Sequence, residues 1–295
     1  MRYCLVSFCL GFIPLGLAAQ LQVFVSIQPQ AYFVERIAGE WVTVESLVPA
    51  DNSPESFQPT IQQVAALAQA DYYFTQGLPF EGGMVGKLQT TAIGLKVIET
   101  QAVTGEFSCV HPADSEHHHH AHAGENHFDP HTWLSPERVK QQIAVIRDAL
   151  LQGIPSQAAK INDNTQALIA DIDAMDNEIK TLFKPFAGYT FLVYHPAFGY
   201  FADAYGLQQQ SIEFEGKGPS PKQLLAVLAK AKAEQVRVVF TQPQFSQKSA
   251  EVIANAIGGQ VVVLDPLAYN YLENMRSIAY KIASSFGGKV LSQTD

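Results

Sequence analysis

Histidine is concentrated in one part of the chain: eight of the nine imidazoles lie between His111 and His131, and the ninth is His195. Alanine, glycine, aspartate and glutamate separate them, a composition with little ability to pack a core, so we expect a mobile, solvated loop over residues 111–131. Neutral imidazole suits zinc, copper and nickel. We therefore predict an auxiliary, low-affinity metal site in this loop, made by His117, His118, His119, His120, His122 and His127.

Side chains that bind metal ions also follow three strand-like segments elsewhere. Glu55 lies in SPESF, His195 begins HPAFGYF, and Asp265 begins DPL. Ligands of open α/β sheets bind outside the carboxyl ends of the strands. We therefore expect Glu55, His195 and Asp265 to converge in one cleft, with His131 of DPHTWLSP as a fourth donor. A helix predicted to begin with a cap and a proline at Ser135–Pro136 would hold the loop of His131 in place.

Each of these residues also has an ordinary structural explanation. His195 follows an apolar strand and is equally consistent with a buried, hydrogen-bonded core histidine. Asp265 and Asp129 both precede a proline, where an aspartate commonly opens a turn. Glu55 is consistent with a plain surface charge. The joint occurrence of such groups at the mouths of predicted strands is what favours a metal site.

The elements that must position these residues alternate between strand and helix patterns, which predicts parallel sheets with helices on their faces. The strands are expected at Leu21–Ile27, Val42–Val48, Asp71–Thr75 and Lys96–Glu99, and then at Thr190–His195, Ser211–Phe214, Val236–Phe240 and Val261–Asp265. The helices between them are expected at Gln30–Ala38, Thr60–Gln69 and Phe80–Gln89, and then at Ser220–Ala233, Ser246–Ile257 and Tyr271–Phe286.

A long segment without strand signal, proline or glycine separates the two halves. Its apolar residues recur at steps of three and four, the period of one helical face, so we predict a single rigid helix over residues 156–184. The fold class is therefore α/β, with two lobes, each holding a mostly parallel sheet flanked by helices. The N-terminal lobe is expected over residues 20–155, including the histidine loop, and the C-terminal lobe over residues 185–295.

Composition and the chain start restrict the location and partners. A net charge of -9, with no run of lysine or arginine, argues against a nucleic-acid partner. The first twenty residues, MRYCLVSFCLGFIPLGLAAQ, resemble a signal peptide over residues 1–19 better than a membrane anchor, because the apolar run is short. Cys109 is then the lone mature cysteine, and neither early cysteine follows a lipid-anchor motif. We expect a soluble, monomeric periplasmic protein.

Five segments carry a resemblance to a known family. In chain order they are SPESFQPT, DPHTWLSP, YHPAFGYFADAYG, EGKGPSPKQL and LDPL, and with the long helix they resemble the metal-binding subunits of ABC importers for zinc and manganese. The resemblance implies two α/β lobes bridged by one rigid helix, a divalent metal ion in the cleft, and delivery of that ion to a membrane permease. Carried over by motif, the family's four metal ligands fall on Glu55, His131, His195 and Asp265.

One position departs from the zinc-type members, which commonly have histidine where this chain has Glu55. Two imidazoles and two carboxylates form a harder donor set, closer to manganese-type members. Ser53, Asp51 or water is an alternative to Glu55 in the metal's shell. The histidine loop favours zinc, because imidazole suits Zn(II) whereas manganese prefers oxygen donors. We therefore predict Zn(II) as the transported ion and keep Mn(II) as the alternative.

Two further functions remain open from the sequence. The first is a metal-dependent hydrolase, which needs a vacant position on the metal and a general base. Glu213 or Glu215 is a candidate for the base, but the sequence has no HExxH, GxSxG or P-loop motif. A surface adhesin or metallochaperone on the same scaffold is the other. If the imidazoles bind metal, affinity should fall as the pH drops through about 6.5, the ordinary pKa of histidine.

Overall fold

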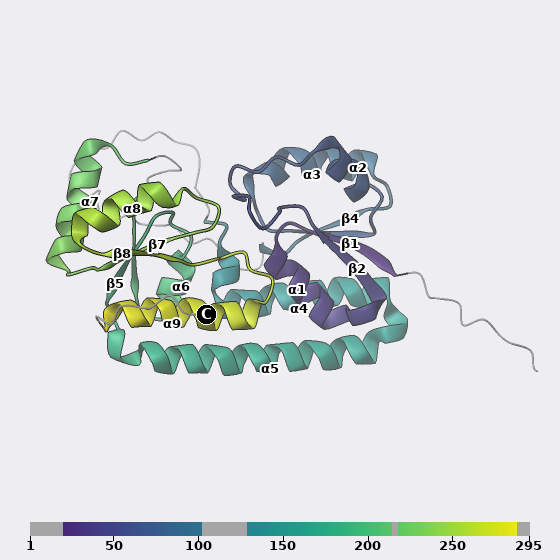
Figure 1. Cartoon of the computed structure of the whole chain (residues 1–295). Coiled ribbons are helices and arrows are strands. Elements are labelled where there is room, and N and C mark those ends of the chain that lie inside the picture. Colours follow the sequence, from purple (N-terminus) through teal and green to yellow (C-terminus); the bar gives the residue numbers. More distant parts are fainter. Residues whose placement is uncertain (1–19, 102–128, 214–217, 288–295) are drawn as a thin grey trace, which may run out of the picture.

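The computed structural model describes residues 20–101, 129–213 and 218–287, which form two lobes side by side along one long helix (Figure 1). The predicted signal segment and the six auxiliary histidines lie outside the described residues. Within the described part, no helix is both long enough and apolar enough to span a bilayer. The predicted fold class is confirmed, since each lobe holds a four-stranded parallel sheet flanked by helices.

The N-terminal lobe contains a sheet in the order β2-β1-β3-β4. Its central strand β3 has the sequence YYFT and is buried along its whole length, as expected for a strand covered on both faces. The described elements of this lobe's sheet and flanks are β1 Leu21–Val25, α1 Gln28–Ala38, β2 Val42–Ser46, α2 Ile61–Leu67, β3 Tyr72–Thr75, α3 Pro79–Thr91 and β4 Lys96–Glu99.

The C-terminal lobe repeats this arrangement with a sheet in the order β6-β5-β7-β8. Its described elements are β5 Thr190–Val193, α6 Gly199–Ala204, β6 Gln208–Ser211, α7 Pro221–Ala233, β7 Val238–Thr241, α8 Gln247–Ile257, β8 Gln260–Val263 and α9 Tyr271–Phe286. The prediction for β6 was wrong by three residues, because this edge strand is the polar QQQS and not the apolar SIEF that follows. An edge strand has one free side, so polar side chains are tolerated there.

The long helix α5 runs from Ala158 to Phe183 and confirms the predicted bridge between the lobes. It packs against α1 and α4 (Pro136–Gly153) of the first lobe and against α9 of the second. Its buried stripe includes Leu168, Ile172 and Met175, spaced by three and four residues as a core-facing helix requires. One hydrophobic cluster thus continues through both lobes, and α5 packs on both of them.

Local capping signals explain where the helices begin. Thr60 and Gln63 form the predicted capping box at the start of α2, with Thr60 N donating to Gln63 Oε1 at 2.9 Å and Gln63 N donating to Thr60 Oγ1 at 3.2 Å. Ser220 caps α7 through the same pattern. α4 begins at Pro136 as expected, but the Ser135 side chain makes no capping hydrogen bond, so the proline and not the serine fixes this start.

Candidate metal centre

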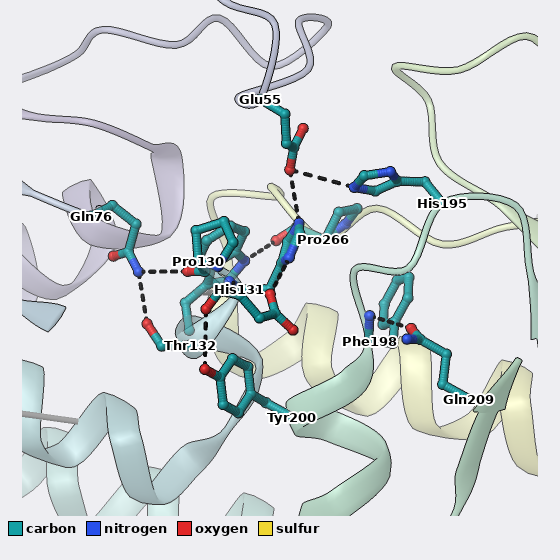
Figure 2. Close-up of polar contacts among 12 residues, drawn as sticks. Glu55, Gln76, Pro130, His131, Thr132, His195, Phe198, Tyr200, Gln209 and Pro266 are labelled. Carbon is teal, nitrogen blue, oxygen red and sulfur yellow. Dashed lines mark hydrogen bonds and ion pairs between the residues drawn. The ribbon is translucent and has the colours of Figure 1, made fainter. Parts of the chain in front are cut away.

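Glu55, His131 and His195 lie together where the two lobes face each other (Figure 2). One potential ligand atom from each falls within 4.8 Å of the others. Oε1 of Glu55 lies 2.9 Å from Nε2 of His131 and 3.5 Å from Nε2 of His195. Two imidazole nitrogens and one carboxylate oxygen therefore point at a common centre.

The three residues come from three separate segments of the chain. Glu55 lies on the β2–α2 loop (residues 47–60), and His195 lies two residues beyond the end of β5. His131 directly precedes the short 3₁₀ helix Thr132–Leu134 that leads into α4. Glu55 and His195 thus occupy the carboxyl ends of parallel strands in opposite lobes, as expected for a ligand site of an α/β fold.

The pocket around these atoms is very small. Its volume is about 10 Å³, which is the room that one water molecule needs. A single ion fits this space. The lining residues are Pro54, Glu55, His131, Trp133, His195, Ala197, Gln242, Gln244, Phe245, Pro266 and Leu267.

Each imidazole is oriented by a second carboxylate on its other nitrogen. Nδ1 of His131 lies 2.6 Å from Oδ1 of Asp129, and Nδ1 of His195 lies 2.8 Å from Oε2 of Glu213. Both carboxylates are buried. Metal-binding histidines are commonly held in this way, because the carboxylate fixes the ring and leaves the opposite nitrogen free for the ion. Nε2 is therefore the candidate ligand atom in both residues.

The segment that carries His131 is clamped from both lobes (Figure 2). Gln76 of the N-terminal lobe donates its Nε2 to the carbonyl of Pro130 at 3.1 Å and to Oγ1 of Thr132 at 2.8 Å. Tyr200 of α6 donates its hydroxyl to the carbonyl of Asp129 at 3.1 Å. These bonds fix the backbone on either side of His131, so its ring is held in place before any ion arrives.

The three residues strongly shift one another's protonation. Burial alone would raise the pKa of Glu55, but the imidazoles of His131 and His195 outweigh burial and hold it well below its usual range. Burial opposes the charged form of His131, yet Asp129 and Glu55 overcome this and raise its pKa to about 10. The pKa of His195 is also raised, since Glu213 and Glu55 outweigh its burial. Without metal the Glu55 carboxylate thus favours the charged form of both imidazoles, and the imidazoles favour the charged form of Glu55.

Hydrogen bonding leaves two of the converging atoms unsatisfied. Oε1 of Glu55 and Nε2 of His195 are buried, and neither has a hydrogen-bond partner of good geometry within the described structure. The other carboxylate oxygen of Glu55 accepts a bond from Ser53 Oγ at 2.5 Å. Both atoms instead meet in the close contacts of Glu55 Oε1 with the two imidazoles, and a divalent cation bound among them would replace those contacts with ligand bonds. The donor set and its surroundings thus fit a divalent metal ion.

Asp265 stands apart from the other three predicted ligands. Its Oδ1 accepts the backbone N–H of Leu267 at 2.9 Å, a local turn that directs this oxygen at its own backbone. The next two residues, Pro266 and Leu267, line the pocket, so the loop of Asp265 reaches the site while its carboxylate is not among the converging donors. Its role as a fourth ligand stays a prediction.

The alternatives considered for this site occupy other positions. Ser53 donates to Glu55 and so supports it as a neighbour, and Asp51 is exposed in the same loop. Glu213, the candidate hydrolytic base, is engaged by His195, while Glu215 lies outside the described residues. Sequence reasoning missed Asp129 and Glu213 as partners of the histidines. The position of Asp129, two residues before His131, could have suggested that pair from the sequence. No feature of the sequence indicates that Glu213 pairs with His195.

Two parallel-sheet lobes, one long helix joining them and a Glu–His–His cluster at the facing strand ends define a two-lobed protein with a candidate metal centre in its cleft. The family model described as "Zinc-uptake complex component A periplasmic" (ZnuA) matches residues 23–285. The chain therefore belongs to the ZnuA family, which confirms the resemblance drawn from its motifs.

Solved structures agree with this membership. A structure described as "Crystal structure of ZnuA" is 35% identical, with a TM-score of 0.81 over 90% of this chain and 99% of that one. A zinc-bound ZnuA deletion mutant is 36% identical, with a TM-score of 0.80 over 90% of this chain and 98% of that one. The periplasmic zinc-binding protein TroA of Treponema pallidum, at 18% identity and a TM-score of 0.78 over 90% and 99% of the two chains, shares the fold.

Curated relatives are more distant in sequence. The zinc-binding lipoprotein AdcA of Streptococcus pneumoniae serotype 4 is 28% identical over 255 residues, which are 84% of this chain but only 50% of AdcA. The chain therefore spans half the length of that relative. A putative metal-binding protein of Chlamydia trachomatis serovar D is 26% identical over 268 residues, or 89% of this chain and 91% of the relative.

Proposed function

We propose that this protein captures a divalent transition metal ion outside the cytoplasm, with Zn(II) as its cargo, and delivers it to the membrane permease of an ABC importer. The observation that carries the proposal is the convergence of Glu55, His131 and His195 from both lobes on a pocket with room for one ion. Deprotonated donors would close on Zn(II) at about 2.0–2.2 Å.

The donor set and the relatives support zinc. Two imidazole nitrogens and a carboxylate oxygen suit Zn(II), while Mn(II) prefers sites richer in oxygen. If Asp265 completed the shell, the set would become two nitrogens and two oxygens, which is the arrangement that favours Mn(II) as the alternative cargo. Zinc is the metal in the zinc-bound ZnuA deletion mutant, at 36% identity, and we extend that cargo to this chain.

A binding protein fits the site better than a hydrolase. Two histidines and a glutamate also hold zinc in some hydrolases, so the ligands alone do not decide the matter. A hydrolase needs a free general base and room for a substrate. Here Asp129 and Glu213 are the carboxylates beside the ligands, and each is engaged by an imidazole.

The remaining parts of the proposal follow from the sequence. Residues 1–19 would act as a signal peptide that exports the chain to the periplasm, in agreement with the periplasmic description of its family. The loop of residues 111–131 would gather scarce zinc near the cleft. The mature protein would act as a monomer whose partners are the metal ion and the permease, with no nucleic acid involved.

Metal titration of the purified mature protein tests the proposal. Isothermal titration of the chelator-treated wild type with Zn(II) and with Mn(II) should reveal one tight Zn(II) site that Mn(II) occupies at least tenfold more weakly. His131→Ala and His195→Ala should each abolish tight binding, because each removes a donor from a site with few. Glu251→Gln, an exposed position on α8, is the matched control and should bind as the wild type does.

A loop deletion separates the cleft from the auxiliary histidines. Removal of residues 117–127 should leave the tight site intact and eliminate only weaker binding. Loss of tight binding on this deletion, or its survival in both histidine variants, would overturn the assignment of the cleft as the capture site. Tighter binding of Mn(II) than of Zn(II) would support the cleft as the capture site but would make Mn(II) the cargo.

A further inference from the structure

The β7–α8 loop, residues 242–246, contacts a metal-ligand candidate with two side chains. Gln242 is 1% exposed and donates its Nε2 to the carbonyl of His195 at 2.9 Å. The ring of Phe245 stacks on the imidazole of His195, with centroids 4.7 Å apart and planes 18° apart. The loop is therefore attached to His195 by a hydrogen bond and by a ring contact.

Gln244, between these two residues, reaches across to the other lobe. Its Nε2 donates to the carbonyl of Ala50 at 2.7 Å, a contact between residues 194 positions apart. Ala50 belongs to the β2–α2 loop and lies five residues before Glu55. Both loops lie on the side of the molecule away from α5 (Figure 1). This bond thus joins the loop attached to His195 directly to the loop that carries Glu55.

Two other hydrogen bonds that join the lobes lie in a different place. Trp133 Nε1 donates to the carbonyl of Pro266 at 2.8 Å, and the hydroxyl of Tyr269 donates to the Glu35 carboxylate. Their C-terminal partners belong to the segment that enters α9, and α9 packs on α5. These bonds therefore lie beside the packing of α9 on α5, whereas the bond of Gln244 joins the loop of Glu55 to the loop that packs on His195.

We propose that Gln244 is a latch of the metal site, which slows the release of a bound ion by tying together the loops of Glu55 and His195. The inference rests on the proposed function and adds a residue that positions the ligands without binding the metal. Glu55 and His195 must stay within coordination distance of one ion from opposite lobes. A bond made in the closed arrangement and broken on opening affects the dissociation rate more than the association rate.

Stopped-flow release of Zn(II) into an excess of a chromogenic chelator measures the latch directly. Gln244→Met removes the donor while nearly keeping the side chain's shape. Release should become about two- to tenfold faster, as expected for the loss of one neutral hydrogen bond, with association changed by less than about twofold. Gln244→Asn keeps the amide but is one methylene shorter, and should accelerate release in the same way. Gln247→Met, at an exposed position where α8 begins, is the matched control and should match the wild type.

The outcomes separate the latch from the proposed function. Equal release rates for the wild type, Gln244→Met and Gln244→Asn would overturn the latch while leaving zinc capture intact, and so would an equal acceleration by Gln247→Met. Failure of the wild type to bind Zn(II) would overturn the proposed function and the latch with it. Circular dichroism and thermal unfolding in chelator verify folding, which these substitutions in a partly exposed loop should preserve.

Discussion

The indole N–H of Trp133 donates to the carbonyl of Pro266 at 2.8 Å and so binds the segment of His131 to the segment of Asp265 across 133 positions. Trp133 is 1% exposed, so this bond is sheltered from water. It fixes the backbone beside Asp265, whose Oδ1 is then satisfied by the N–H of Leu267. The link explains how the loop of Asp265 lines the site while its carboxylate does not converge with the other donors.

Substitution of Asp265 tests its predicted role as a fourth ligand. If the carboxylate leaves its local turn to bind the ion, Asp265→Ala should weaken Zn(II) binding by tenfold or more. The variant should also change the coordination of bound Co(II), which is measured by its visible absorption. Asp265→Asn keeps a turn-forming oxygen and removes the charge, which separates ligation from loop geometry. Wild-type affinity in both variants would limit the protein's own ligands to Glu55, His131 and His195.

The carboxylates behind the two histidines should influence metal affinity without touching the metal. Asp129→Asn and Glu213→Gln keep the approximate shape of each side chain but weaken its hold on the Nδ1 proton of His131 or His195. We expect Zn(II) affinity to fall about 10- to 100-fold in each variant, the usual range for such supporting groups. The metal content at saturation should stay at one ion in the cleft. No change in affinity, measured by chelator competition, would show that these carboxylates only fill space.

The fold was predictable because its signals are local and repeated. Apolar strand patterns alternate with helical ones, and the capping residues Thr60 and Ser220 indicate where two of the helices begin. The β6 strand was misplaced because sheet edges accept the polar residues of QQQS, so pattern alone does not reveal it. The position of a strand in its sheet is set by packing against distant partners.

The candidate site was partly predictable for a related reason. Glu55 and His195 follow strand ends, and that position is visible in the sequence. The pairing of Glu213 with His195 and the reach of Gln244 to Ala50 depend on how loops from separate strands meet, which the sequence does not encode by spacing. Asp265 illustrates another limit, because its Oδ1 accepts the backbone N–H of Leu267 in a local turn that the sequence pattern also allows. Its ligation of the ion stays a prediction.

Position 55 should control the choice between zinc and manganese. Glu55→His replaces an oxygen donor by a nitrogen donor and gives the histidine commonly found in zinc-type members of the family. We expect the ratio of Zn(II) to Mn(II) affinity to rise at least tenfold, because imidazole favours Zn(II) over Mn(II). Competition titrations with both metals measure the ratio, and Glu251→Gln serves as the control. An unchanged ratio would mean that Glu55 does not coordinate the ion.

The pH dependence of stability should reverse when zinc binds. Without metal, the raised pKa of His131 contributes stability that is fully present below its ordinary value of 6.5 and is lost as pH rises toward about 10. The lowered pKa of Glu55 contributes stability that is present above its ordinary value of 4.5 and is lost on acidification. In the chelator-treated protein, the contribution of this cluster to the free energy of unfolding should therefore be largest between about pH 4.5 and 6.5.

With zinc bound, stability should rise and not fall as the pH increases above about 6.5. The reason is that Zn(II) must displace the imidazole protons and therefore binds more tightly at higher pH. Urea unfolding at pH 6 and pH 8.5 tests this. The metal-free wild type should lose stability at the higher pH relative to His131→Ala, while the wild type in excess Zn(II) should gain stability relative to that variant. Parallel pH profiles for the wild type and His131→Ala in chelator would contradict the charged cluster, and a falling profile in zinc would contradict imidazole ligation.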